Sequence, residues 1–219
     1  MNIQAIAFDL DGTLIDTAPD IGAALNRALN AHDLPGVPAE AARGWIGDGP
    51  DRLIERALAH LNVEPIAAMS ETLRSAFDKA TLAAPLEKGR VFDGITELLT
   101  QWFRKLPMVV VTNKPTALSR HVLSAAGLID FFDTVLGADE PAQRKPAPAL
   151  LLTAAAKLNI EPASLLMVGD SVNDLRCALA AGCPAAWVSW GYGAWPESAP
   201  PETWRIGSAG ELAERIALH

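Results

Sequence analysis

The chain has few cysteines and no long apolar run, and each shortage excludes a class of protein. Its 219 residues include two cysteines, Cys177 and Cys183, which are too few for a disulfide framework. Both stand in an Ala- and Leu-rich run, so we expect buried thiols and a cytoplasmic protein. No apolar run reaches the roughly 18 residues of a membrane-spanning helix, and the chain starts without a cationic leader. We therefore expect no membrane partner.

Positive charge is also scarce. The chain carries 18 Lys and Arg against 26 Asp and Glu, a net charge of −8, and we find no run of five basic residues. This balance argues against a nucleic-acid partner. Half of the residues are apolar, so a chain of this length can bury one full core and carry one insertion. The histidines have no metal-ligand spacing, and we expect surface or structural roles for His32, His60, His121 and His219.

Two aspartates follow the first apolar segment. Residues 3–8 have the pattern of a buried parallel strand, and Asp9 and Asp11 come at its carboxyl end, next to a turn at Gly12. Open α/β sheets bind their ligands at this end of the strands. Two carboxylates brought to one site repel each other unless a cation is present, so a divalent metal ion is predicted here. The alternative is a pair of solvated turn residues.

Two further segments place polar side chains after expected strands. Thr112 and Asn113 follow the apolar segment 108–111, and both can hold a phosphate oxygen by neutral hydrogen bonds. The alternative for this pair is a helix N-cap. Lys145 follows a strand expected at 134–136 and precedes a proline, which keeps it on a stiff extended loop. There its ammonium can neutralise an anionic centre, although an isolated loop lysine is usually solvated.

A fourth apolar segment, 165–168, runs through Gly169 into Asp170. This carboxylate also stands at a strand end, ready to join an oxygen site for a hard cation. Asn173 and Asp174 begin the helix that we expect next, where they can brace the metal ligands. The alternative for Asp174 is stabilisation of the helix dipole.

In this order and context, the four segments resemble the signature motifs of the haloacid dehalogenase superfamily, and the resemblance runs from Ile3 to about Val188. It implies a phosphatase of small phosphate monoesters with Mg²⁺ as cofactor. By the same resemblance, Asp9 is the nucleophile that forms an aspartyl-phosphate, and Asp11 is the general acid and base. The implied metal ligands are Asp9, Asp170 and the backbone carbonyl of Asp11, and the implied phosphoryl ligands are Thr112, Asn113 and Lys145.

Between the first motif and Gly89 the pattern is helical only. An insert of about 70 residues is too long for a loop and is typical of a small helical cap. We therefore expect a Rossmann-like, doubly wound parallel sheet, formed by 1–15 and 85–219, with an inserted all-helical cap at 16–84. A cap at this place lies beside the site, where it can exclude water and select the substrate.

Within the cap, Gly47, Asp48 and Gly49 precede a helix that starts at Pro50. The two glycines allow a tight turn, and the first amides of the helix can face a substrate carboxylate. The alternative is an ordinary turn between helices. Together with residues 112–115 and 169–171, this stretch resembles the bacterial phosphoglycolate phosphatases of the superfamily, which implies 2-phosphoglycolate as substrate.

Three rivals to this interpretation remain. The first two share the catalytic core, namely a phosphatase of a sugar phosphate and a β-phosphoglucomutase-like mutase. The third is a catalytically idle binding protein on the same fold. We expect a monomer or a homodimer. Four tryptophans lie between 187 and 204, in a segment too apolar for a flexible linker, and we expect it to pack over the core rather than to form a subunit contact.

Overall fold

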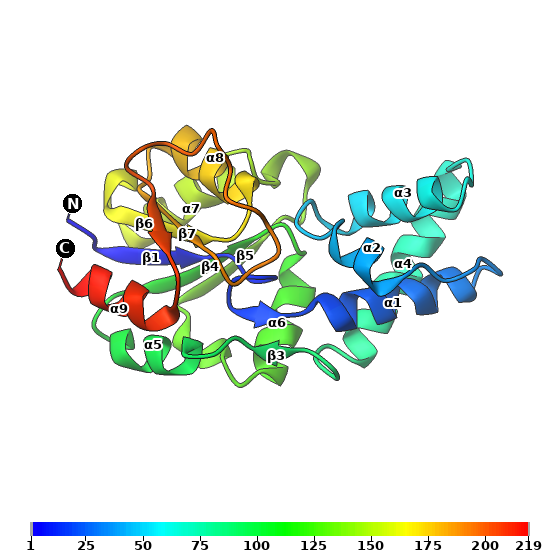
Figure 1. Cartoon of the computed structure of the whole chain (residues 1–219), viewed down its shortest axis with the longest axis horizontal. Coiled ribbons are helices and arrows are strands. Elements are labelled where there is room, and N and C mark those ends of the chain that lie inside the picture. Colours follow the sequence, from blue (N-terminus) through cyan, green and yellow to red (C-terminus); the bar gives the residue numbers. More distant parts are fainter. Residues whose placement is uncertain (1, 219) are drawn as a thin grey trace.

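Six short parallel strands form the central sheet of the computed structural model (Figure 1), which describes residues 2–218. Met1 and His219, one of the four histidines, lie outside this range. The strand order is β5-β4-β1-β6-β7-β8. The strands are β1 (Ala5–Phe8), β4 (Met108–Thr112), β5 (Thr134–Gly137), β6 (Leu165–Gly169), β7 (Ala185–Val188) and β8 (Trp204–Ile206).

Helices cover both faces of this sheet because its central strands, β1, β4 and β6, are buried along their whole length. On one face, Ile6 and Phe8 of β1 belong to the same buried cluster as the apolar side chains of α5 (Ile95–Trp102), α6 (Thr116–Ala125) and α9 (Ala209–Ala217). On the other face, Ala5 and Ala7 pack with α7 (Ala149–Leu158) and α8 (Val172–Ala181). Figure 1 shows α7 and α8 above the sheet and α5 and α9 below it. The expected doubly wound parallel sheet is confirmed.

Four helices lie to one side of the sheet, at the right of Figure 1. They have a hydrophobic cluster of their own, which includes Leu25, Leu58 and Phe77. Within the described residues, 17–89 contain no strand, so the inserted region is helical as expected. We call these helices the cap, and its division from the core at 15/16 and 84/85 stays a prediction. The cap helices are α1 (Ala18–Asn30), α2 (Ala39–Arg43), α3 (Pro50–His60) and α4 (Ala67–Ala83).

The chain enters and leaves the cap through a two-stranded antiparallel ribbon, β2 (Ile15–Asp16) and β3 (Arg90–Val91). Just inside it, the buried carboxylate of Asp20 accepts the backbone N–H groups of residues 87, 88 and 89 at 2.9, 2.9 and 2.7 Å. A carboxylate that accepts several N–H groups is a strong structural tie. Asp20 therefore joins the beginning of the cap to its end.

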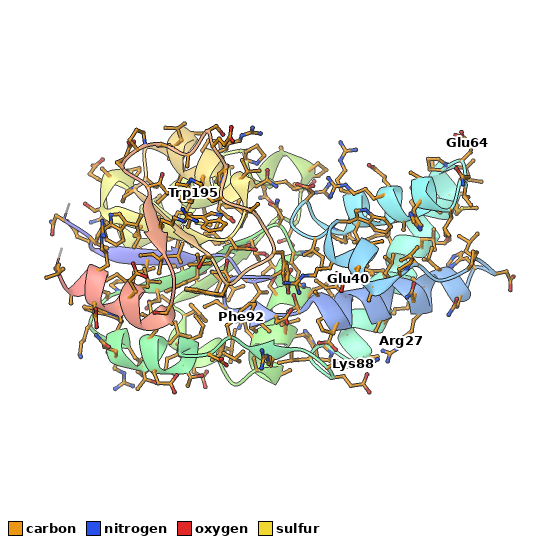
Figure 2. The ribbon with its side chains drawn as sticks, viewed as in Figure 1. Arg27, Glu40, Glu64, Lys88, Phe92 and Trp195 are labelled. Carbon is orange, nitrogen blue, oxygen red and sulfur yellow. The ribbon has the colours of Figure 1, made fainter. Side chains whose placement is uncertain are left out.

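The tryptophan-rich segment packs back over the core, as expected. Trp187 and Trp204 are buried, and the Trp195 ring meets that of Trp187 edge-on at 5.5 Å. Figure 2 shows Trp195 among the side chains over the sheet, whereas Glu64 lies at the end of the cap farthest from it. The indole N–H of Trp190 donates to the carbonyl of Thr13 at 3.0 Å, so this segment also touches the first motif.

The cysteines and the described histidines stand outside any ligand cluster. Cys177 and Cys183 are buried and free. The rings of His32 and His121 each contact a carbonyl one helical turn earlier, and the ring of His60 packs on Trp45. Over residues 2–218, the structure contains no helix that is both long and apolar enough to cross a membrane. The remaining elements are three short 3-10 helices, η1 (Ile129–Phe131), η2 (Pro141–Gln143) and η3 (Pro162–Ser164).

Candidate active site

The motifs of the sequence meet at the carboxyl edge of the sheet. β1 lies between β4 and β6, so the residues that follow these three strands are neighbours. Asp9 and Asp11 follow β1, Thr112 ends β4, and Asp170 follows β6. The strands end here because each apolar run gives way to glycine or polar residues. The edge faces the cap (Figure 1).

Lys145 lies between two buried carboxylates. Its Nζ is 2.8 Å from Oδ1 of Asp9 and 2.6 Å from Oδ1 of Asp174, and it also donates to the carbonyl of Val111 at 2.9 Å. Burial disfavours this ammonium, but the carboxylates of Asp174 and Asp9 outweigh that effect and raise the pKa of Lys145. The lysine is therefore a fixed positive charge beside Asp9.

Asp170 is held by three residues from two separate segments. Its Oδ1 accepts the hydroxyl of Thr13 at 3.1 Å, and its Oδ2 accepts the backbone N–H of Tyr192 at 2.7 Å. Its backbone carbonyl accepts the indole N–H of Trp187 at 3.0 Å. Gly12 has φ +90°, and a side chain at this position would collide with the Asp170 carboxylate. The Asp-Gly turn is thus shaped around this acid.

The acids form a cluster that fits a metal ion. Carboxylate oxygens of Asp9, Asp170 and Asp174 lie within 4.8 Å of one another, and all three residues are buried. Burial, aided by Asp174, raises the pKa of Asp9 to about 7 against the pull of Lys145. Burial and then Asp174 raise the pKa of Asp170 to about 6. Burial and mutual repulsion thus disfavour the ionised carboxylates, and their oxygens are ligands that suit a hard divalent cation.

Asp174 connects Lys145 to the start of α8 through its two carboxylate oxygens. Oδ1 contacts Lys145, and Oδ2 accepts the backbone N–H and the hydroxyl of Ser171 at 3.0 and 2.6 Å. This reciprocal bonding is a capping box at the start of α8. The geometry places Asp174 against the lysine, and its expected role in bracing the metal ligands stays a prediction.

Asp11 has a second lysine as its partner. Lys114 Nζ donates to both Oδ1 and Oδ2 of Asp11 at 2.7 Å, and the hydroxyl of Thr17 donates to Oδ1 at 2.6 Å. Lys114 is 7% exposed, so this pair is shielded from solvent. The Asp11 carboxylate is therefore held apart from the lysine that contacts Asp9.

Thr112 and Asn113, expected to bind the phosphoryl group, both line the pocket beside Asp9. The Asn113 amide nitrogen donates to the carbonyls of Gly47 and Lys145 at 2.8 and 3.1 Å, and its Oδ1 accepts the Lys145 N–H at 2.7 Å. Since these bonds use both amide hydrogens, the side chain connects the lysine loop to the cap.

The cap loop 47–51 is docked on the core. Asn173, whose expected role in bracing the metal ligands stays a prediction, donates to Oδ1 of Asp48 at 2.6 Å. Arg56 holds the other oxygen of Asp48 from within the cap. Asp51, in the first turn of α3, forms an ion pair with Arg144 of the core. The residues that we expected to determine specificity therefore also fasten the cap.

A pocket lies between the cap and the sheet edge, with about 450 Å³ of empty space that is partly open to solvent. Asp9, Asp11 and Lys114 form its charged side, and Gly47 and Gly49 contribute cap backbone. The rest of its wall is mostly apolar, with Ile21, Ile46, Pro50, Leu53, Phe77, Pro115 and Leu118. Such a pocket admits a small ligand next to the acids.

Sequence reasoning missed Lys114, Tyr192 and Thr13. Lys114 stands within the segment 112–115 that carries the resemblance, and its positive charge at the end of a strand was the signal that could have indicated a site residue. Tyr192 is the only tyrosine of the chain, and its hydroxyl donates to Asp16 and accepts the N–H of Ala18 at 2.9 Å each. The backbone of Tyr192 thus holds Asp170, while its side chain holds Asp16 and Ala18, where the chain enters the cap.

Comparisons with known proteins agree with this geometry. The model of the haloacid dehalogenase-like hydrolases matches residues 3–182. A phosphoglycolate phosphatase from Pectobacterium atrosepticum is 40% identical over 191 residues, or 87% of this chain and 82% of the relative. A crystal structure described as a predicted phosphoglycolate phosphatase from Haemophilus somnus 129PT is 28% identical, with a TM-score of 0.86 and coverage of 100% and 98%. CbbY from Rhodobacter sphaeroides, solved with phosphate, is 25% identical, with a TM-score of 0.82 and 96% coverage of each chain.

Proposed function

Because this chain belongs to the family of haloacid dehalogenase-like hydrolases, we propose that it hydrolyses 2-phosphoglycolate to glycolate and phosphate through an aspartyl-phosphate on Asp9. The observation that carries the proposal is the position of Asp9, buried at the sheet edge 2.8 Å from the ammonium of Lys145. A carboxylate can attack a phosphate dianion only where the repulsion between them is neutralised. Lys145 supplies a permanent positive charge at that point.

In the proposed reaction, an Asp9 oxygen forms a bond to phosphorus while the ester P–O bond breaks. Asp11 gives a proton to the leaving oxygen, and then takes a proton from the water that attacks the aspartyl-phosphate and releases phosphate. To carry that proton, the Asp11 carboxyl would give up one of its two hydrogen bonds from Lys114. Thr112 and Lys145 bind the phosphoryl oxygens, and Lys145 would do so with the donor that now contacts Asp9. Asn113 holds the Lys145 loop, and a direct contact of its amide with the phosphoryl group would require one of its present bonds to break.

We propose Mg²⁺ as the cofactor, held by Asp9, Asp170 and the backbone carbonyl of Asp11. When bound, it would neutralise charge on the phosphoryl oxygens. The buried carboxylates of Asp9 and Asp170 fit a hard cation, and Thr13 and Tyr192 orient Asp170 for it. Asp174 keeps Lys145 in place from behind.

The choice of 2-phosphoglycolate rests on the small pocket and on the relative from Pectobacterium atrosepticum. A compact ester suits the apolar wall of this pocket better than a sugar phosphate does, because the hydroxyl groups of a sugar would meet apolar side chains. The first turn of α3, with Gly47, Asp48 and Gly49 before it, is proposed to close over the substrate. We further propose that the partner is a small molecule and that the protein acts in the cytoplasm. We expect it to be a monomer or a homodimer.

The test is phosphate release with Mg²⁺ across 2-phosphoglycolate, glucose 1-phosphate, glucose 6-phosphate and an amino-sugar phosphate, compared by kcat/KM. We expect a clear preference for 2-phosphoglycolate that is abolished in Asp9→Asn, because an amide is a poor nucleophile. The exposed Asp130→Asn is the matched control and keeps full activity.

Each other outcome would favour a different interpretation. Preference for a sugar phosphate would retain the nucleophile and discard the substrate. Conversion of glucose 1-phosphate to glucose 6-phosphate without net phosphate release would show a mutase. Full activity in Asp9→Asn would exclude the aspartyl-phosphate itself.

A further inference from the structure

Lys114 is a buried lysine that the proposed reaction leaves without a role. It follows β4 and lines the pocket, where it is 7% exposed. Its Nζ donates to both oxygens of the Asp11 carboxylate at 2.7 Å. An ammonium has three N–H donors, so this pairing uses two of them. The third donor has no acceptor among residues 2–218, and Lys114 lines the pocket.

The two buried lysines of the site differ in this respect. Lys145 has three acceptors within 2.9 Å, namely Asp9, Asp174 and the carbonyl of Val111, so its donors are all engaged. Within residues 2–218, Lys114 has side-chain hydrogen bonds to Asp11 alone, and it is the one cation that lines the pocket. A ligand anion in the pocket would therefore find its donor at Lys114.

Lys114 and Lys145 also differ in their place relative to the ester P–O bond that the proposed reaction breaks. Lys145 contacts the Asp9 carboxylate, which is proposed to attack phosphorus. Lys114 contacts Asp11, the group proposed to protonate the leaving oxygen. The first lysine thus serves the transferred phosphoryl group, and the second faces the leaving group. A carboxylate one carbon away from the leaving oxygen would lie on the Lys114 side.

We propose that Lys114 determines specificity by binding a second anionic group on the leaving side of the substrate, while it positions the Asp11 carboxylate. This inference rests on the proposed function and names the residue that selects the substrate class. The class is a small phosphate monoester with a carboxylate next to the ester carbon. The apolar wall opposite, with Ile46, Leu53 and Phe77, offers no hydrogen bond to such a group, so its desolvation is compensated at Lys114.

A matched pair of substrates tests the proposal. 2-Phosphoglycolate carries the carboxylate, and 2-hydroxyethyl phosphate carries a hydroxymethyl group in its place. We expect wild type to prefer the carboxylate, and Lys114→Gln to lower the ratio of the two kcat/KM values by about 10- to 100-fold, the size expected for one lost charged hydrogen bond. Both substrates also lose some rate because Asp11 is less well positioned. Lys79→Gln, exposed on α4, is the control and leaves the ratio unchanged.

The loss should appear mainly in KM for 2-phosphoglycolate, while inhibition by inorganic phosphate stays within about threefold of wild type, since Lys145 binds the phosphoryl group. An equal loss for both substrates, which preserves the ratio of the two kcat/KM values, would overturn the proposal and leave Lys114 a merely structural role. It would spare the proposed function if wild type still preferred the carboxylate.

Two further outcomes separate this inference from the proposed function. Wild type that hydrolyses both esters without preferring the carboxylate would overturn the substrate assignment and the role of Lys114 together. Wild type that hydrolyses neither would overturn the proposed function alone. In that case calorimetric titration with 2-phosphoglycolate decides, because the inference requires weaker binding to Lys114→Gln than to wild type and fails if the two bind equally.

Discussion

The Nζ of Lys145 lies 2.8 Å from Oδ1 of Asp9, with both residues buried at the edge of the sheet. The pair is part of a longer arrangement, since Asp174 holds the same ammonium at 2.6 Å. One cation thus faces two carboxylates, with Asp170 close by. This surplus of negative charge is costly in a folded protein and useful in a metal site, and the first two predictions follow from it.

Replacing Lys145 by methionine removes the cation but keeps a side chain of similar length. We expect the free energy of unfolding at pH 8, measured with denaturant and EDTA, to fall by about 3–5 kcal/mol, because two buried carboxylates lose their partner. With Mg²⁺ and substrate, kcat should fall by at least about 100-fold. Lys157→Met, exposed on α7, is the control. A Lys145 variant as stable as this control would contradict the prediction.

The acid cluster predicts how stability depends on pH. The pKa values of Asp9 and Asp170 are raised to about 7 and about 6, whereas carboxyls of the unfolded chain titrate near a pKa of about 3.9. Between these values the native protein holds protons that the unfolded chain has released. The metal-free protein should therefore lose stability as pH rises from 4 through about 7. Lys145, with its raised pKa, stays charged across this window and adds no slope.

Mg²⁺ should oppose this loss because it binds the ionised carboxylates. We expect Mg²⁺ to raise Tm more at pH 8 than at pH 5.5, by the equivalent of about 2 kcal/mol. Thermal unfolding with Mg²⁺ and with EDTA at both pH values measures the difference. The Asp9→Asn, Asp170→Asn double variant should show a smaller dependence of Tm on pH. An equal Mg²⁺ effect at the two pH values would show that these carboxyls are not the metal ligands.

A glycine beside Asp170 supplies the third prediction. The backbone of the C-terminal segment passes so close to Asp170 that a Cβ at Gly191 would collide with the side chain of this acid. Gly191→Ala should therefore displace the carboxylate and lower Mg²⁺ affinity by about 10- to 100-fold, as measured by the Mg²⁺ dependence of kcat. A Cβ at Gly210 in α9 would meet only the Ser208 hydroxyl, at 3.9 Å, so Gly210→Ala should not change this affinity. Unchanged affinity in Gly191→Ala would argue against Asp170 as a ligand.

The central sheet and its acids could be predicted because their signals are local. Residues 165–169 form β6, and Asp170 follows it, because an apolar run that ends at glycine and a polar residue is a strand-end pattern. The same reasoning placed Asp9 after β1. Parallel order then brings the strand ends together without further information.

The contacts that shape the pocket could not be predicted in this way. Lys114 and Asp11 are 103 residues apart, and Asn173 and Asp48 are 125 apart. Hydrophobic periodicity tells which face of an element is buried but not which polar groups meet across two elements. The sequence predicts that Asn173 lies at the start of a helix near the metal ligands. It does not predict that the cap loop with Asp48 lies close enough to accept a hydrogen bond from Asn173.

The bond between Asn173 and Asp48 gives the last prediction. The amide of Asn173 donates to Oδ1 of Asp48 at 2.6 Å and so joins α8 of the core to the loop before α3. Asn173→Ala removes this bond but leaves Asp48 paired with Arg56, so the free energy of unfolding should fall by only about 1 kcal/mol. The loop would close over the substrate less often, and we expect KM to rise about 10-fold.

Steady-state kinetics and denaturant unfolding of the same preparations check both parts of this prediction. Asn30→Ala, exposed at the end of α1, is the matched control and should leave KM and stability unchanged. A large loss of stability would mean that the bond holds the fold together rather than the closed cap. An unchanged KM would mean that the loop stays docked without it, and that Asn113 and Arg144 suffice to fasten the cap.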